Sequence, residues 1–220
     1  MLYNFISVNT TWNREKVVEL MKEIECEVVF LDLPEHFEAY IVNGIIPPQD
    51  FGYSQDLRAC EPIVRFCWEN GIPIYCYIET KLSKELVDIQ MEIARLILKT
   101  KLKKKIDVEE WKRVIMRDIE LRNSSDEYTE MKIRENAKKE NVCLNLSRQL
   151  ENELGDLGVK RIVLYEFRRP IDKLYELASR EMNGEEVSDE YWLEAIERHI
   201  AFVDTVIEMG YEEACKLLWI

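Results

Sequence analysis

Residues 28–33 read VVFLDL, and this run decides the fold class. Its side chains are apolar almost throughout and do not alternate with polar ones, which is typical of a parallel strand covered on both faces. A second apolar run, LYNFISV at residues 2–8, precedes it, and Asn13 between the two runs can cap a helix that extends to Glu25. These three segments predict a β-α-β unit.

Two later runs predict further strands. Residues 72–78 (IPIYCYI) follow a helix expected near 56–70, and Gly71 stands where a helix stop is favoured. Residues 161–165 (RIVLY) follow GDLGVK, whose two glycines end the preceding helix. The predicted fold class is therefore α/β, with a small central, mostly parallel sheet of about four strands flanked by many helices.

Most of the remaining chain carries apolar residues at three- and four-residue steps, which predicts helices. Segments 81–104 and 108–122 predict a helical insertion at about 81–122. A long helix is expected at 126–154. A helical C-terminal extension is predicted at about 170–220, with a helix capped by Ser188 or Asp189 and a short one after Gly210. Because composition shows no break typical of a linker, we predict a single α/β domain over residues 1–220.

Charge and hydropathy exclude several classes of protein. The formal net charge is −13, with 43 acidic against 30 basic residues, so a nucleic-acid backbone would be repelled. No apolar stretch is long enough to span a membrane, and the first residues, MLYNFISVN, show neither a basic leader nor a cleavage site. We expect a cytoplasmic protein with no nucleic-acid or membrane partner. Abundant Glu, Lys, Ile and Val beside scarce Gln is a bias reported for proteins that work at high temperature.

Several common catalytic and metal-binding motifs are missing from the sequence. The six cysteines form no CxxC pair and no Cys/His cluster with zinc-finger spacing, so we expect them to be buried core residues. The sequence also contains no P-loop, GxGxxG or GxSxG motif.

Polar residues lie at the carboxyl end of every predicted strand, at the sheet edge where ligands bind in open parallel sheets. These residues are Asn9, Asp32, Glu79, Glu166, Arg168 and Arg169. Asp32 lies within an apolar run, and an unpaired buried carboxylate costs several kcal/mol, so it needs a partner. Arg168 and Arg169 are the candidates that the sequence offers.

Two interpretations of these residues stay open. In one, Asp32, Glu61, Glu79, Glu135 and Glu166 surround a cleft that holds a divalent cation or does acid–base work, while the arginines bind an anion. In the other, the same charges form an internal ion-pair network that orders the helices on the sheet.

The order of segments resembles the TraB/TIKI and erythromycin-esterase-like superfamily over roughly residues 1–178. SVNTTWN and VVFLDLPE are similar to that superfamily's opening strand, GxxH turn, helix and second strand, with Asp32 in place of a glutamate. DLRACEPIVRFCWENGIPIYCYIE is similar to its glutamate-bearing helix and third strand, which suggests Glu61. RENA at 134–137 is similar to its arginine-glutamate pair, and RIVLYEFRRPIDKL to its final strand and loop.

This chain departs from the superfamily at both expected histidines. Asn9 or Thr10 stands where the GxxH histidine would fall, and Arg168 or Arg169 stands in the last loop. The resemblance implies a metal-dependent hydrolase, but without these imidazoles only oxygen donors remain. We therefore expect a catalytically degenerate member.

The first functional hypothesis is binding of a small anionic ligand or a protein partner, in a cleft at the carboxyl ends of the strands or on the acidic helical surface. Arg134, Arg168 and Arg169 would supply the anion contacts, because the arginine fork suits carboxylate and phosphate. Asn9, Glu79 and Glu166 would complete the binding site.

The alternative is a hydrolase in which Asp32, Glu61 and Glu135 hold Mg²⁺ or Mn²⁺ and Arg168 stabilises developing negative charge. A third hypothesis makes the helical parts a homo-oligomer interface, with Tyr191, Trp192 and Phe202 either there or in the core.

Overall fold

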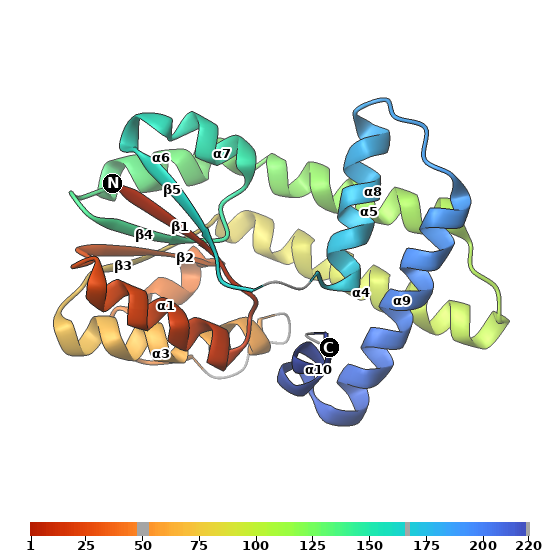
Figure 1. Cartoon of the computed structure of the whole chain (residues 1–220), viewed down its shortest axis with the longest axis horizontal. Coiled ribbons are helices and arrows are strands. Elements are labelled where there is room, and N and C mark those ends of the chain that lie inside the picture. The colour runs from red at the N-terminus through yellow and green to blue at the C-terminus, as the bar shows by residue number, and fades with distance from the viewer. Residues whose placement is uncertain (48–52, 166–167, 219–220) are drawn as a thin grey trace. The chain divides into compact units, whose positions relative to one another are not determined.

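The described strands form one five-stranded, wholly parallel sheet (Figure 1). The computed structural model describes residues 1–47, 53–165 and 168–218. The strands are β1 (Leu2–Ile6), β2 (Val28–Pro34), β3 (Ile74–Ile78), β4 (Asn141–Leu144) and β5 (Val159–Val163). They lie in the order β3-β2-β4-β1-β5. The predicted α/β class is confirmed, with five strands in place of about four.

The helices of the described residues follow the sequence predictions closely in most places. They are α1 (Thr11–Glu23), α2 (Glu38–Ile41), α3 (Ser54–Asn70), α4 (Thr80–Lys103), α5 (Val108–Asn123), α6 (Asp126–Asn136), α7 (Arg148–Glu153), α8 (Pro170–Met182), α9 (Asp189–Met209) and α10 (Tyr211–Leu217), with short 3-10 turns at Glu35–Phe37 and Gly155–Leu157. Gly71 ends α3 with a φ of 65°, a left-handed conformation that glycine adopts without strain. The Ser188 side chain caps α9 by accepting a hydrogen bond from the Glu190 backbone N–H.

One predicted element is wrong. The sequence pattern favoured a continuous helix over 126–154, but α6 ends at Asn136 and the chain then forms β4 before α7 begins. All four residues of β4 are buried, and the strand pairs with β1 on one side and β2 on the other. A central strand of the sheet therefore lies where a helix was expected.

The described residues form two compact units. The first comprises Met1–Ser83 and Ser125–Tyr165 and holds the sheet; the second comprises Lys84–Ser124 and the described part of Glu166–Ile220 and is helical. The prediction of one domain over residues 1–220 stays a prediction.

In the first unit, helices cover both faces of the sheet. Figure 1 shows α1 and α3 on one face and α6 and α7 on the other. Val17 and Met21 of α1 are buried, while Ile133 of α6 and Leu150 of α7 pack with Phe30 of β2. Burial on both faces explains why the β2 sequence is apolar without alternation.

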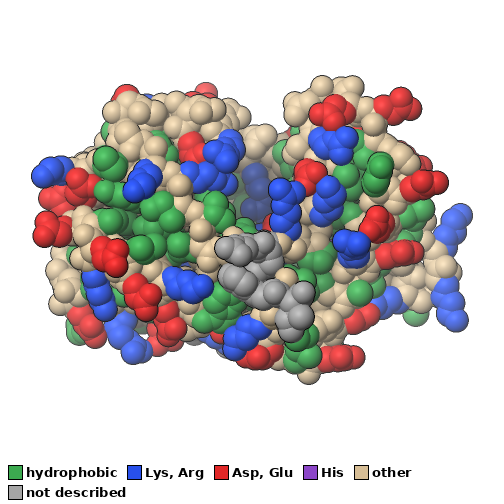
Figure 2. Space-filling view, viewed as in Figure 1, with side chains coloured by type: hydrophobic (Ala, Val, Ile, Leu, Met, Phe, Trp, Pro, Cys, Tyr) green, Lys and Arg blue, Asp and Glu red, His purple; other side chains and the backbone are tan. Residues whose placement is uncertain are grey.

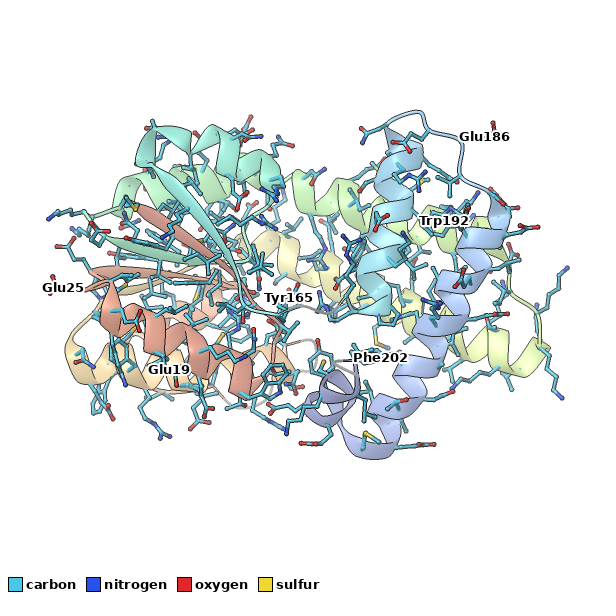
Figure 3. All side chains as sticks on the ribbon, in the orientation of Figure 1. Glu19, Glu25, Tyr165, Glu186, Trp192 and Phe202 are labelled. Carbon is cyan, nitrogen blue, oxygen red and sulfur yellow. The ribbon has the colours of Figure 1, made fainter. Side chains whose placement is uncertain are left out.

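In the second unit, two tryptophans occupy the core between helices. Trp111 of α5 and Trp192 of α9 are both fully buried, and Leu174 and Leu177 of α8 pack in the same cluster. Figure 3 shows Trp192 on α9 where that helix faces α8, and its indole N–H donates to Glu181 at 3.0 Å. Among the described helices, none is both long and apolar enough to cross a membrane.

Candidate functional site

A buried ion pair lies at the carboxyl ends of the strands. Arg14 lies in the first turns of α1, on the same helical stripe as Val17 and Met21, and its side chain is 0% exposed. Its Nη2 donates to both carboxylate oxygens of Asp32, at 3.0 and 2.9 Å. The partner of Asp32 is therefore Arg14, whereas the sequence had pointed to Arg168 or Arg169.

Two asparagines and a second carboxylate complete this group. Asn145, which follows β4, donates to Asp32 Oδ2 at 2.6 Å and accepts from the Ser7 backbone N–H at 2.8 Å. Asn9 accepts from Arg14 Nη2 at 2.6 Å, and its own side-chain amide donates to Asp56. We call Asn9, Arg14, Asp32, Asp56 and Asn145 the strand-edge cluster.

Within the strand-edge cluster, the charge of Asp32 is balanced by Arg14. Burial lowers the pKa of the Arg14 guanidinium, but the negative charge of Asp32 and its hydrogen bonds outweigh burial, so the pKa is raised. Each oxygen of Asp32 accepts a hydrogen bond from Arg14, and Oδ2 also accepts from Asn145. Within residues 1–47, 53–165 and 168–218, no group of three or more His, Cys, Asp or Glu side chains could hold a metal ion.

Among the described residues, Glu61, Glu79 and Glu135 were also predicted for this site, and none of them has a hydrogen bond to the strand-edge cluster. Glu61 lies on an exposed face of α3 and pairs with Arg65 at 2.7 Å. Glu135 is exposed on α6, and Glu79 is half-buried directly after β3. Glu166 lies outside the described residues.

The described hydrogen bonds of the arginines predicted to bind an anion go to residues other than Asp32. Arg134 is on α6, where it binds Asp156 at 2.8 and 3.0 Å and Glu130 at 2.7 Å. Arg168 and Arg169 belong to the second unit, just before α8.

Arg168 and Arg169 line a cavity of about 590 Å³, and all of its described lining residues belong to the second unit. Two more basic residues line it, Lys173 on α8 and Arg198 on α9. The described residues that line it are Arg168, Arg169, Pro170, Lys173, Tyr191, Glu194, Ala195, Arg198, Ala201, Phe202, Thr205, Ala214, Leu217 and Leu218. On the face shown in Figure 2, Lys and Arg side chains gather over α8.

Arg169 donates hydrogen bonds to two neighbouring side chains of the second unit. Its Nε and Nη2 bind both oxygens of Asp172, at 3.0 and 2.7 Å, and its Nη1 donates to the Tyr211 hydroxyl at 3.3 Å. Burial lowers the pKa of Arg169, and its neighbours Tyr211 and Asp172 raise it by more. Burial also raises the pKa of Tyr211 to about 12, so this hydroxyl is neutral at physiological pH.

The other three cations of the cavity make exposed ion pairs. Arg168 and Lys173 share Glu176, at 2.6 and 2.7 Å. Arg198 pairs with Glu194 one helical turn away, at 2.6 Å. Arg168 and Arg198 keep 76% and 72% of their side-chain surface exposed, so solvent and ligands can reach them.

Some of these residues were missed by reasoning from sequence. Arg14 shares its stripe with Val17 and Met21, a spacing that could have marked it as buried. Lys173 and Arg198 carry no such signal, because each resembles an ordinary charged residue on a helix surface. Of the aromatic residues considered for an interface, Trp192 is fully buried in the core, while Tyr191 is 60% exposed beside the cavity.

Comparisons of this chain with protein-family models, with curated proteins and with solved structures find no match. The resemblance to the TraB/TIKI and erythromycin-esterase-like superfamily therefore stays an expectation.

Proposed function

We propose that this protein binds an organic anion in the cavity of its second unit and is a catalytically degenerate relative of the TraB/TIKI superfamily. One observation carries the proposal: four basic side chains line this cavity, and Glu194 is the only acid among the described residues that line it. The whole chain has a net charge of −13, so a lining in which the described basic residues outnumber the acids runs against its composition. A concave site with converging cations attracts anions and orients them through charge-assisted hydrogen bonds.

The existing ion pairs at the cavity leave these cations available. Exposed pairs such as Arg198–Glu194 and Arg168–Glu176 contribute about 0–1 kcal/mol each, because water screens them and holding two long side chains costs entropy. A carboxylate or phosphate that enters the cavity can replace the internal acids at little cost. Arg169 is held by Asp172 and Tyr211, so it would act as a preorganised hydrogen-bond donor at the N-terminus of α8.

This proposal changes the location expected for the ligand. The sequence predicted a cleft at the carboxyl ends of the strands, with Asn9, Glu79, Arg134 and Glu166 among its ligand contacts. Arg14 and Asn145 already occupy the Asp32 carboxylate, which favours a structural role for the strand-edge cluster. A role for Arg134 in anion binding and a metal-dependent hydrolase using Asp32, Glu61, Glu135 and Arg168 remain predictions.

Isothermal titration calorimetry with inorganic phosphate, pyrophosphate, citrate and octanoate tests the proposal. We expect at least one of these anions to bind saturably and to bind more weakly as salt is raised, because the contact is electrostatic. The variant with both Arg168→Ala and Arg198→Ala should lose at least about tenfold in affinity, the equivalent of roughly 1.4 kcal/mol.

The matched control removes two exposed arginines of the first unit, Arg65→Ala with Arg148→Ala, and changes the net charge equally. It should bind like the wild type. Absence of binding by all four anions, or equal losses in both double variants, would overturn the proposal.

A further inference from the structure

The cavity of the second unit is lined by apolar side chains as well as by cations, and we call these apolar side chains its apolar wall. Ala195, Ala201 and Phe202 of α9 contribute to it, and Ala214, Leu217 and Leu218 come from α10 and the residue after it. Phe202 packs edge-to-face on Tyr211 with ring centroids 6.3 Å apart, and Figure 3 shows Phe202 on the side of α9 that faces α10.

Most of the cations and the leucines of the apolar wall come from different segments of the chain. Arg168, Arg169 and Lys173 lie at the start of α8, whereas the leucines are contributed by the C-terminal segment. On α9, Arg198 lies one helical turn after Ala195 and one turn before Ala201 and Phe202, so a cation there neighbours apolar side chains. A ligand that satisfies both surfaces needs a charged end and an apolar end.

The volume of the cavity also favours an organic ligand with an apolar part. Pockets for organic ligands typically measure roughly 300–1,000 Å³, and this one measures about 590 Å³. Inorganic phosphate would contact the cations and leave most of the apolar wall in water. Burial of that wall by a hydrocarbon chain is favourable by about 25 cal/mol for each Å² removed from solvent.

We infer that the ligand is an amphipathic organic anion, that is, an aliphatic chain whose anionic head group contacts Arg168, Arg169 and Lys173 and whose chain lies against Phe202, Leu217 and Leu218. This inference rests on the proposed function, since it assigns the class of anion for the same cavity.

A series of straight-chain acids tests the inference. Calorimetry with acetate, butanoate and octanoate should give affinities that rise with length, by more than tenfold from butanoate to octanoate. Four added methylenes would allow a larger gain if each were fully buried, since about 0.8 kcal/mol per methylene is roughly fourfold in affinity. Octanol, which has the same chain but no charge, should bind more weakly than octanoate.

Two matched substitutions locate the chain of the ligand. Ala201→Trp places a large ring at an exposed position of the cavity lining and should weaken octanoate at least tenfold while leaving the fold intact by circular dichroism. Ile207→Trp, on the same helix at a position 75% exposed and outside the lining, should have no effect.

The outcomes separate this inference from the proposed function. If phosphate or acetate binds as tightly as octanoate and depends on Arg168 and Arg198, anion binding stands and the amphipathic class is wrong. Octanoate binding that survives Ala201→Trp places the chain elsewhere and overturns the inference. If no anion binds, both fail.

Discussion

The side chain of Asn145 donates a hydrogen bond of 2.6 Å to Asp32 from a backbone held at a φ of 57°. Asparagine tolerates this left-handed conformation better than most residues, and here it lets one side chain reach both Asp32 and the backbone of Ser7. We predict that Asn145→Ala destabilises the protein by about 2–4 kcal/mol, through lost hydrogen bonds and added backbone strain. Chemical denaturation measures the free energy of unfolding.

Asn145→Gly separates these two causes, because glycine removes the hydrogen bonds but adopts a φ of 57° without strain. It should be about 1 kcal/mol more stable than Asn145→Ala. Equal stability of the two variants would show that strain at this position is negligible.

The Arg14–Asp32 pair should behave as a buried ion pair in a double-mutant cycle. Arg14→Met leaves the carboxylate without its cation and should cost about 3–5 kcal/mol. The combined variant, Arg14→Met with Asp32→Leu, should recover most of this loss, because both charges leave the interior together. Arg14 Nε and Nη1 are also buried without a hydrogen-bond partner among the described residues, which adds to the cost of keeping the charge there. Additive losses in the double variant would contradict this view.

His199 should make stability depend on pH below neutrality. It is 7% exposed and meets Trp111 edge-on at 6.0 Å, and burial, with a smaller effect of Arg169 that outweighs Asp172, lowers its pKa from 6.5 to about 4. The unfolded chain therefore binds a proton before the folded one does, so the free energy of unfolding falls as pH drops from 6.5 towards 4. The contribution is about 2–3 kcal/mol.

His199→Phe keeps a ring against Trp111 and removes the titrating group. Denaturation at pH 7 and at pH 4.5 should show a smaller loss of stability in this variant than in the wild type. Carboxylates titrate in both proteins, so only the difference between them reports on His199. Identical pH profiles would exclude this role.

Calorimetric titration with Mg²⁺, Mn²⁺ and Zn²⁺ tests the hydrolase alternative. We expect no saturable binding to the wild type, because the oxygens of Asp32 already accept hydrogen bonds from Arg14 and Asn145. Asp32→Asn is a suitable comparison, since its shape is unchanged and only the charge is lost. Binding to the wild type that disappears in a folded Asp32→Asn variant would restore the metal-dependent hydrolase.

Most of the fold could be predicted from the sequence, but the central strand β4 could not. Segments such as 28–33 and 72–78 are apolar and bounded by turn residues, so their strands could be predicted. β4 has only four residues, Asn141–Leu144, and no glycine or proline separates it from α6. Ile133, Cys143 and Leu150 also happen to continue a helical spacing across it. Only tertiary pairing with β1 and β2 decides that this segment is extended.

The site was harder to predict than the fold. That Asp32 needs a partner followed from its apolar surroundings, but the choice of Arg14 over Arg168 depends on how α1 packs on the sheet. The cavity is built from α8, α9 and α10 by packing between helices, and its lining mixes residues up to fifty positions apart. Periodicity within one helix cannot show which faces of three helices meet.

The placement of β1 sets an order of events during synthesis. Both of its neighbours in the sheet, β4 and β5, are encoded far downstream, beginning at Asn141 and Val159. As the ribosome extends the chain, β1 has no edge to pair with until those segments emerge, and β2 waits for β4 as well. β1 is thus made long before it can be enclosed by β4 and β5, and late closure of long loops favours slow folding with exposed strand edges.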